Sequence, residues 1–394
     1  MTIKLLTEPS KKIGGFSLQE LILYGFTVTL CLSIGSVKYF LDYPAYIDQW
    51  RTILVAPEKV AELGTNAYGA THVLFAYIYS ISPGAPRLAF SLIWLLGGAL
   101  LLRRCRTFSL PGWIGWSILI FLYLNPYFLR LYAYGQNDLA VSGMLLIAVM
   151  CHRDRRDIPA GLIFALALSY KFYPIVAIPF LVFDSQERTD RGIVKRIRWK
   201  FLLSVAAMTV ALLIWTYIKM GPSALAPYSF LATRAATESS LAYFATHILG
   251  TNALQRLGFL PGGIAILLLF VAFVKLRWSQ YQSAILALIA LFIFSPVFYY
   301  VYIIGTVALV FENATWQSIH DKPSLAVWIA PVSYMAMMLG VFFLIEMLTR
   351  LQGFPLIAFK GAIYAVTNVL LSILIIFELS RSDDEALSKT REIY

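Results

Sequence analysis

Apolar stretches long enough to cross a lipid bilayer recur along most of the chain, and they restrict its fold more than any other feature. A membrane-spanning helix requires about 20 mainly apolar residues. Stretches close to this length are 19–40, 87–102, 112–129, 136–151, 199–219, 260–276, 324–346 and 356–379. Only 13% of the residues are charged, whereas soluble domains carry about 25%. The sequence therefore predicts an all-α, polytopic membrane protein, in which residues 1–394 form a single membrane domain.

Basic residues beside these stretches predict which ends are cytoplasmic, because cytoplasmic loops are enriched in Lys and Arg. These basic residues are Lys11, Lys12, Arg103, Arg104, Arg106, Arg153, Arg155, Arg156, Lys275 and Arg277. Segments 41–86, 130–136 and 220–259 then lie outside, and 41–86 and 220–259 form the first and second outer loops. The same clustering accounts for the net charge of +11 without a nucleic acid partner.

Two further apolar stretches, 158–183 and 281–311, are interrupted by proline. Basic clusters flank 158–183 on both sides, so a single crossing would place one cluster on the wrong side. Proline disfavours a helical conformation of the residue before it. We therefore expect breaks at Lys171–Pro174 and at Ser295–Pro296, each between two short helices that meet toward the outer side. Counting both stretches as two helices gives about twelve segments, and ten or eleven remain alternatives.

The first outer loop contains an amphipathic pattern. An apolar series recurs at helical spacing, with the charged residues Asp48 and Arg51 on the opposite face; the series consists of Tyr43, Ile47, Trp50 and Leu54. Such a pattern is typical of a helix that lies in the membrane interface. We therefore expect this loop to be structured.

Ionisable side chains at membrane depth are candidates for chemistry, because they are costly there. Asp42 directly follows the first span and can act as a general base toward an attacking hydroxyl. The alternatives are a solvated helix end and a rival carboxylate at Asp48. Lys171, at the tip of the predicted hairpin, can contact a phosphate as a point charge. The alternative is a lysine that extends along the apolar surface to reach water.

Polar residues at two other places extend this set. Gln136, Asn137 and Asp138, which open the fourth span, can bond sugar hydroxyls or a phosphate. Asn at a helix start is also an ordinary N-cap. His72, late in the first outer loop, can bind substrate or phosphate, but a lone loop histidine is more often structural. The four histidines have no paired spacing, so we expect no metal site, and no motif indicates a cofactor.

Several ordered pieces of the chain together resemble the GT-C membrane glycosyltransferases, and within them glycosyltransferase family 87. That family is typified by polyprenyl-phosphate-mannose-dependent mannosyltransferases. The pieces are Asp42 with Tyr46; Asn125–Pro126 followed by Gly135, Gln136 and Asn137; Ala160–Gly161 running on to Lys171, Tyr173 and Pro174; and Ser295–Pro296 followed by Tyr299 and Tyr300. The resemblance covers roughly residues 40–300. One departure is Tyr68–Gly69, where the family usually has Tyr-Pro.

The resemblance implies a GT-C fold with about 10–12 transmembrane segments and a cleft open to the periplasm or exterior of a cell membrane, most simply a bacterial inner membrane. It implies that Asp42 is the catalytic base and that Lys171 contacts the donor phosphate. The other residues expected at the substrate site are Tyr46, His72, Gln136, Asn137, Tyr173 and Tyr299.

The implied reaction is an inverting transfer of a mannosyl or other hexosyl or pentosyl group. The donor is a polyprenyl-phosphate-linked sugar, and the acceptor is a glycan or glycolipid at the outer face of the membrane. Alternatives are a glycan polymerase or ligase, and a polytopic transporter or lipid flippase. The broken stretches fit a transporter, but its two halves would be expected to resemble each other, and we find no such repeat. The sequence leaves the sugar, the acceptor and the oligomeric state open.

Overall fold

The computed structural model describes residues 12–13, 15–33, 42–63, 68–184, 196–227, 237, 240–275, 278–296, 303–320, 327–336, 339–340, 343, 359 and 362–376. This part of the chain is mainly helical and so confirms the predicted all-α fold class. Two antiparallel pairings join short strands: β1 (Lys12–Ile13) with β2 (Phe16–Ser17), and β3 (Phe183–Asp184) with β4 (Arg196–Ile197). The chain divides into two compact units. Unit 1 contains residues 1–174, 199–234 and 318–323, and unit 2 contains residues 175–198, 235–317 and 324–394.

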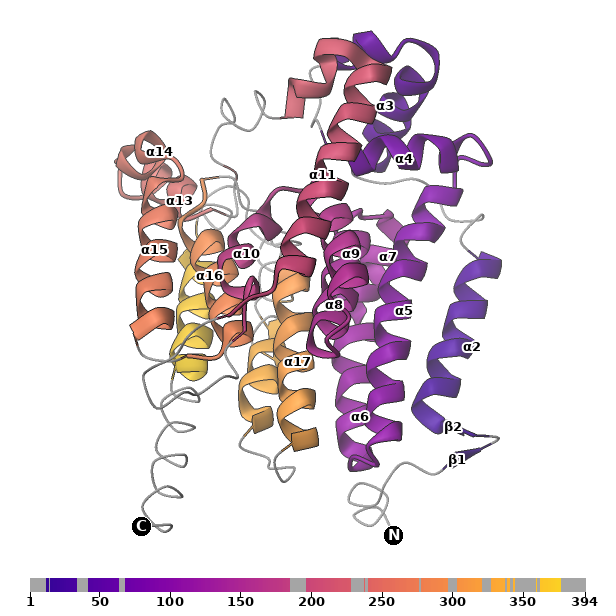
Figure 1. The fold of residues 1–394 in the computed structure, drawn as a ribbon, viewed down its shortest axis with the longest axis vertical. Coiled ribbons are helices and arrows are strands. Elements are labelled where there is room, and N and C mark those ends of the chain that lie inside the picture. Colours follow the sequence, from indigo (N-terminus) through magenta and orange to yellow (C-terminus); the bar gives the residue numbers. More distant parts are fainter. Residues whose placement is uncertain are drawn as a thin grey trace. The chain divides into compact units, whose positions relative to one another are not determined.

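Unit 1 is a helical bundle in which α5 packs on α8, α8 on α9, and α9 on α11 (Figure 1). Its helices, in chain order, are α2 (Leu18–Ser33), α3 (Tyr43–Val55), the 3-10 helix η2 (Pro57–Leu63), α4 (Ala70–Tyr79), α5 (Ala85–Thr107), α6 (Gly112–Ile118), the π-helix η3 (Leu119–Tyr123), α7 (Pro126–Tyr134), α8 (Asp138–Arg153), α9 (Asp157–Tyr170), α11 (Trp199–Met220) and the 3-10 helix η5 (Gly221–Leu225).

One end of unit 1 gathers basic residues. At the C-terminal end of α5, Arg106 pairs with the buried Glu20 of α2 at 2.8 Å, and Arg104 pairs with Asp154 after α8 at 2.6 Å. Glu20 also accepts a hydrogen bond from the Ser17 backbone N–H, and its own N–H donates to the Ser17 hydroxyl, so the two residues form a capping box. These contacts fasten the ends of three helices together.

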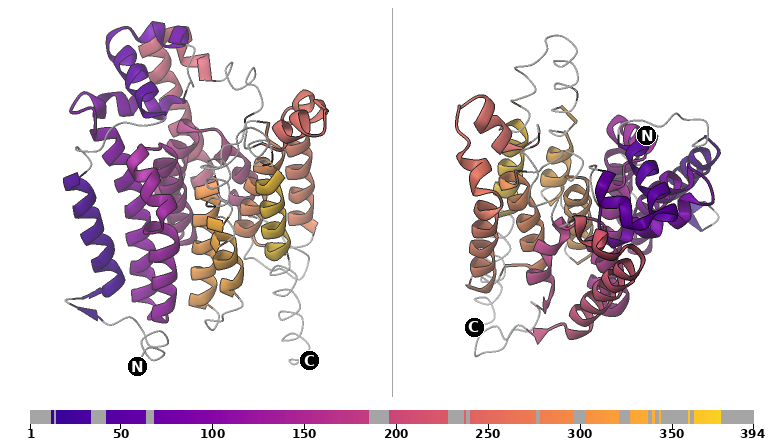
Figure 2. Two further views of the ribbon diagram at one scale, coloured as in Figure 1. Left: turned by 180° about the vertical axis from the view of Figure 1, so that it is seen from behind. Right: turned by 90° about the horizontal axis from the view of Figure 1, so that it is seen from above.

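The opposite end of unit 1 carries α3 and α4. Figure 1 shows these helices at the top of unit 1 and strands β1 and β2 at the bottom, and the left view of Figure 2 keeps the same separation. Helix α5 runs between the two ends and has 23 residues, or about 35 Å at 1.5 Å per residue. This length exceeds the bilayer hydrocarbon thickness of about 30 Å.

Among the described residues, two helices have the length and composition to cross a membrane, Ala85–Thr107 and Trp199–Leu225. Gly112–Tyr123 and Pro126–Tyr134, bent by 44°, form a third candidate if taken together. Helix α11 buries one stripe of side chains and exposes others that are apolar, including Leu203, Val210, Ile214 and Ile218. An exposed apolar face of this kind suits contact with lipid. The total number of segments stays a prediction.

The predicted breaks in 158–183 and 281–311 are confirmed. Helix α9 ends at Tyr170, and the 3-10 helix η4 (Tyr173–Ala177) and α10 (Ile178–Leu181) follow. Pro174 has no N–H to donate to the carbonyl four residues before it, which is that of Tyr170. Helix α16 (Gln280–Phe294) likewise ends before Pro296, and α17 (Ile303–His320) follows. It stays a prediction that the chain turns back at each break toward the side of the membrane from which it entered.

Helix α3 confirms the helical pattern in the first outer loop. Tyr43, Ile47 and Trp50 are buried, and the charged side chains lie on the exposed face, but Leu54 is 38% exposed. The buried face packs against α4 within unit 1, and the Trp50 indole N–H donates to the His72 carbonyl at 3.2 Å. The position of α3 in the membrane interface stays a prediction.

Unit 2 also consists of helices. Besides α10, α16 and α17, it contains α13 (Leu241–His247), α14 (Ala253–Leu257), α15 (Leu260–Lys275) and the helices Val327–Ala336 and Ala362–Ile376. Helix α16 is mostly buried and packs along α15, whose outer face exposes apolar side chains. Phe180 of α10 contacts Phe273 of α15 at 5.4 Å between ring centres.

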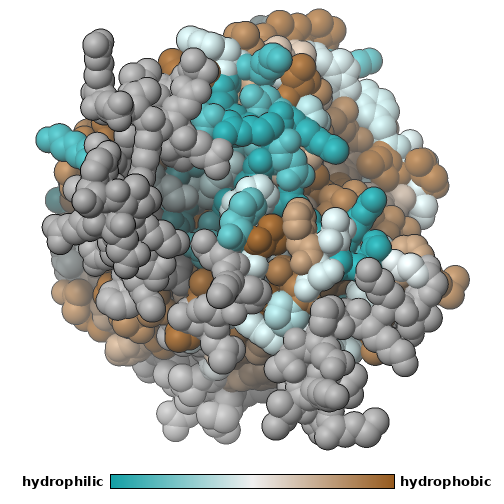
Figure 3. Space-filling view, turned by 60° about the horizontal axis from the view of Figure 1, so that its bottom comes forward, coloured by the Kyte–Doolittle hydropathy of each residue, from teal (hydrophilic) through white to brown (hydrophobic). Residues whose placement is uncertain are grey.

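Figure 3 views the molecule with the lower end of Figure 1 turned forward. Hydrophilic residues gather there, and hydrophobic residues border them. Apolar side chains that border a polar patch are the distribution expected where a protein surface passes from lipid to water.

Candidate functional site

Hydrogen bonds from the start of α4 hold the end of α9, which Lys171 directly follows. Because Pro174 cannot donate to the Tyr170 carbonyl, that carbonyl needs another partner, and the Gly69 backbone N–H supplies it at 3.2 Å. One turn earlier, the Thr71 hydroxyl donates to the Leu166 carbonyl at 2.8 Å. A proline at position 69 would lack the donating N–H. The departure from the family's Tyr-Pro pattern thus has a structural reason.

Gly69 is also required for the close approach of the two segments. A Cβ atom at this position would overlap the Ser169 carbonyl oxygen, which is backbone and cannot turn aside. We expect Gly69→Ala to lower the free energy of unfolding by about 1–3 kcal/mol, as overpacked sites do. Thermal unfolding in detergent measures this loss. Gly25→Ala in α2 is the matched control because nothing lies within 4 Å of a Cβ there. Equal stability of the two variants would contradict the close contact.

Lys171 forms a buried ion pair with Asp138. Its Nζ lies 2.9 and 2.8 Å from the two carboxylate oxygens, and the two side chains are 10% and 1% exposed, respectively. Asp138 lies in the first turn of α8 and Lys171 directly follows the last turn of α9. Each charge therefore sits at the helix end that stabilises its sign. The preceding Asn137 occupies the N-cap position of α8, as the sequence alternative had it, but its side chain makes no cap hydrogen bond.

A tight turn brings the start of α3 against the segment that leads to Asp138. Gly135 ends α7 with φ of +64°, a conformation that favours glycine. A Cβ there would lie 2.7 Å from both the Arg87 Cγ and the Tyr43 ring. Tyr43 accepts a hydrogen bond from the Arg87 backbone N–H at 3.1 Å. Asp42, the residue before Tyr43, is thereby held at the same end of unit 1 as Asp138.

Asp42 is exposed at the start of α3, and its side chain makes no cap hydrogen bond. Burial raises the pKa of Tyr46 well above its usual value, and Tyr68 and Asp42 raise it further. The Asp138 carboxylate adds to the same rise in the pKa of Tyr46. Both carboxylates therefore lie within electrostatic range of the Tyr46 phenol and of each other.

Aromatic rings connect the two charged positions. The Tyr68 hydroxyl donates to the Tyr46 hydroxyl at 3.4 Å, and the Tyr68 ring centre lies 5.5 Å from the Lys171 Nζ. Tyr68 also contacts the His72 ring at 4.9 Å, and His72 Nδ1 lies 3.3 Å from the Tyr170 hydroxyl. The half-buried Tyr68 thus lies between the helix of Asp42 and the cation.

His72 lies in helix α4 and is 2% exposed, so the expectation of a loop histidine is corrected. The reason is tertiary, because the Trp50 indole stacks on its ring at 5.1 Å. Burial lowers the pKa of His72 to about 3, and the charge of Lys171 acts in the same direction. His72 is therefore neutral near pH 7 and can exchange hydrogen bonds, but it adds no positive charge.

The neutral state of His72 predicts a loss of stability in acid. An unfolded histidine has a pKa of about 6.5, and the folded value is about 3. The unfolded state therefore binds the proton first as the pH falls. The contribution of His72 is fully present above about pH 6.5, and the free energy of unfolding then falls by about 1.4 kcal/mol per pH unit. Thermal unfolding between pH 7 and 5 should show a shallower pH dependence in His72→Gln. Identical pH dependence in both proteins would contradict a buried neutral histidine.

The other predicted site residues fall into two groups. Gln136, Asn137 and Tyr173 are buried in unit 1; Asn137 lies beside the Tyr170 phenol, and Tyr173 lies within electrostatic range of Asp138. Tyr299 lies outside the described residues.

Asp138 was expected among the polar residues that open the fourth span, but its pairing with Lys171 was not. That pairing had a usable signal, because a carboxylate at the start of an apolar span needs a cation at similar depth. Tyr68 and Tyr170 were not predicted as site residues, and no sequence signal points to them, because only the folded chain brings them to Lys171.

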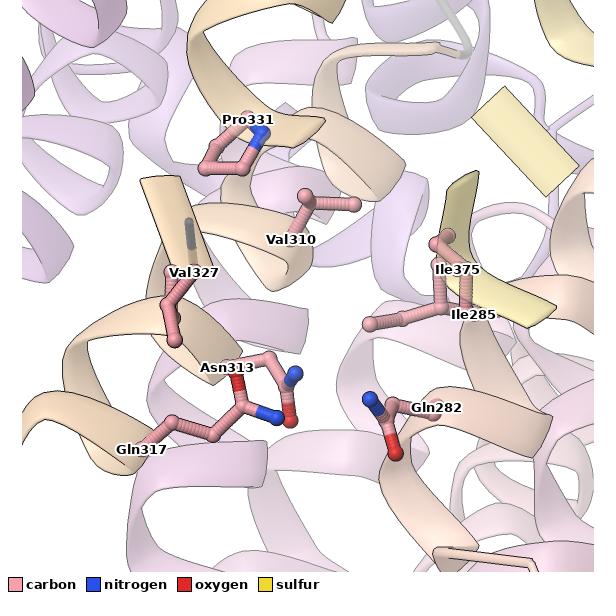
Figure 4. Close-up of a pocket in the computed structure, with 9 residues that line it drawn as sticks. Gln282, Ile285, Val310, Asn313, Gln317, Val327, Pro331 and Ile375 are labelled. Carbon is pink, nitrogen blue, oxygen red and sulfur yellow. The ribbon is translucent and has the colours of Figure 1, made fainter. Parts of the chain in front are cut away.

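A cavity in unit 2 is a different kind of site. Figure 4 shows the carboxamides of Gln282, Asn313 and Gln317 facing one another beside apolar side chains such as Val310 and Ile375. Its volume is about 10 Å³, close to the space that one water molecule needs. No charged side chain is among its nine lining residues. This cavity can bind water but offers no charge for a phosphate.

The chain also matches the model of a known protein family. The model of glycosyltransferase family 87 matches residues 68–298, which is more than half of the chain. The matched region contains Tyr68, Asp138 and Lys171, whereas Asp42 and Tyr46 precede it. None of the curated proteins matches the sequence.

Proposed function

Because the chain belongs to glycosyltransferase family 87, we propose that it transfers a sugar from a polyprenyl-phosphate-linked donor to a hydroxyl of a glycan or glycolipid. The observation that carries this proposal is that two carboxylates act electrostatically on the Tyr46 phenol, namely the exposed Asp42 and the Asp138 that pairs with Lys171. Transfer of this kind needs a base for the acceptor and a cation for the leaving phosphate. Asp42 and Lys171 are of these types.

The proposed step is a single displacement. Asp42 takes the proton of the acceptor hydroxyl while that oxygen attacks the anomeric carbon. The bond from this carbon to the phosphate oxygen breaks, and its electron pair leaves with polyprenyl phosphate, so the configuration inverts. Lys171 stabilises the negative charge that develops on the departing phosphate, which is a contribution specific to the transition state.

The helix ends of unit 1 support an outward-facing site. Arg104 and Arg106 stand at one end of α5, and Arg87, Tyr43 and the turn before Asp138 meet at the other. The positive-inside rule assigns the basic end to the cytoplasm. The candidate site then faces the periplasm or exterior of a cell membrane, such as a bacterial inner membrane. Both units would act as one membrane domain.

Neutral polar groups near the ion pair are proposed to bind the donor sugar. Buried carboxamides and phenols can exchange hydrogen bonds with sugar hydroxyls, and the residues in question are Tyr46, His72, Gln136, Asn137 and Tyr173. The sugar is proposed to be mannose or another hexose or pentose. Tyr299 remains a candidate from the sequence.

A donor panel tests the proposal. Purified protein in lipid nanodiscs would be incubated with membrane glycolipids and polyprenyl phosphates carrying mannose, glucose or arabinose, with the corresponding nucleotide sugars as matched controls. Mass spectrometry would follow the lipid products. We expect one polyprenyl-phosphate sugar to yield free polyprenyl phosphate and a larger glycolipid. Release of polyprenyl diphosphate would favour a polymerase or ligase, and reaction with nucleotide sugars alone would overturn the donor class.

A further inference from the structure

The positive charge of Lys171 is already balanced before any donor binds. Both carboxylate oxygens of Asp138 lie within 2.9 Å of its Nζ, and the pair is almost fully buried. The C-terminal end of α9 adds partial negative charge. If Lys171 served only to attract phosphate, its attraction would be stronger without this carboxylate. The presence of Asp138 therefore needs another explanation.

The proposed reaction changes the charge of the phosphate. The donor is a phosphodiester with one negative charge. When its bond to the anomeric carbon breaks, the phosphate oxygen keeps the electron pair, and the acceptor proton goes to Asp42. The product is a phosphomonoester with a second pKa of about 6, so it is mainly a dianion at pH 8. A lone buried lysine would therefore hold the product more tightly than the donor.

We propose that Asp138 is a counter-charge that weakens the hold of Lys171 on the product phosphate and so permits its release. This inference rests on the proposed function and on the contact between Lys171 and the phosphate. Coulomb energy is proportional to the charge of each partner. Asp138 repels the product through about two charges and the donor through one. If it weakens donor binding by a given factor, it weakens product binding by about the square of that factor.

A purely structural role for Asp138 makes a different prediction. If the carboxylate only holds Lys171 in place, its removal should weaken the binding of both phosphates. The two roles are therefore separated by whether removal of the Asp138 charge raises or lowers the dissociation constants, and by how the change depends on the charge of the phosphate.

Binding measurements test the proposal without requiring turnover. The probes are polyprenyl methyl phosphate, which carries the donor's single charge, and polyprenyl phosphate. At pH 8, Asp138→Asn should lower both dissociation constants; about a threefold fall for the methyl ester should accompany about a tenfold fall for the monoester. Asp154→Asn is the matched control, because it breaks an ion pair at the other end of α8, and both constants should stay unchanged. A rise in either constant in Asp138→Asn, or equal falls in both, would overturn the proposal.

The unaltered protein provides a second test if Asp138→Asn does not fold. With the counter-charge present, polyprenyl phosphate should bind less than about tenfold more tightly than its methyl ester, and a larger difference would contradict the inference. Lys171→Gln tests the phosphate contact of Lys171 separately from the role of Asp138. Unchanged binding in that variant would refute the proposed phosphate contact itself. Weaker binding there, together with a failed Asp138 prediction, would refute only the role of Asp138.

Discussion

Replacement of Asp42 by asparagine is expected to lower the turnover number for sugar transfer by about 10²–10⁴-fold, which is the usual contribution of a general base. Asparagine keeps the shape of the side chain but cannot take the acceptor proton. Asp42 is exposed and makes no cap hydrogen bond, so the variant should fold normally. Steady-state kinetics with the donor found in the panel would measure kcat and KM separately, and we expect the donor KM to change little.

Asp48→Asn provides the control for Asp42→Asn. Asp48 is a second exposed carboxylate on the same helix, so a general loss of negative charge from α3 would affect both variants alike. We expect only the change at position 42 to slow transfer. Turnover of Asp42→Asn within threefold of the unaltered protein, or an equal loss in the two variants, would exclude Asp42 as the base.

Lys171→Gln is expected to lower kcat/KM for the donor by about 10²–10³-fold, because a fixed charge at the leaving phosphate is lost. The same change leaves Asp138 buried without its cation, and breaking a buried pair in this way costs about 3–5 kcal/mol of stability. A fall in kcat/KM alone could therefore reflect either the missing charge at the phosphate or the lower stability of the variant. Thermal unfolding must accompany the rate measurements.

The double variant Lys171→Gln with Asp138→Asn separates these effects. It removes both charges and keeps neutral groups of similar shape, so much of the lost stability should return. Transfer should stay slow, because the cation is still missing. Recovery of kcat/KM together with stability would show that Lys171 has a structural role only.

The sequence predicted the elements around the site better than the contacts between them. The helix end at Lys171 followed from Pro174, and the start of α8 followed from its polar opening segment; both depend on local residues and are confirmed. The Asp138–Lys171 pair joins positions 33 residues apart, and the Gly69 contact with Tyr170 spans a longer separation. Such pairings depend on how α4, α8 and α9 pack, which residue patterns within one helix do not specify.

The candidate base and the candidate cation rest on different support. Lys171 lies within the part of the chain that matches the family, whereas Asp42 lies before it. For Asp42 the support is the geometry of unit 1, where α3 brings it beside Tyr46 and within electrostatic range of Asp138. The Asp42 experiments therefore test the mechanism, and the donor panel tests the family's reaction class in this chain.

The most direct test of a shared, outward-facing site is chemical labelling of Asp42→Cys in a chain whose natural cysteines, Cys31, Cys105 and Cys151, are replaced by alanine. Intact spheroplasts would receive a membrane-impermeant maleimide, and Asp154→Cys at the basic end would serve as the control. We predict that position 42 reacts from outside, that polyprenyl phosphate slows this reaction, and that Lys171→Gln removes the protection. Position 154 should react only after permeabilisation. Labelling of position 42 only after permeabilisation, or protection that does not depend on Lys171, would contradict a shared outer site.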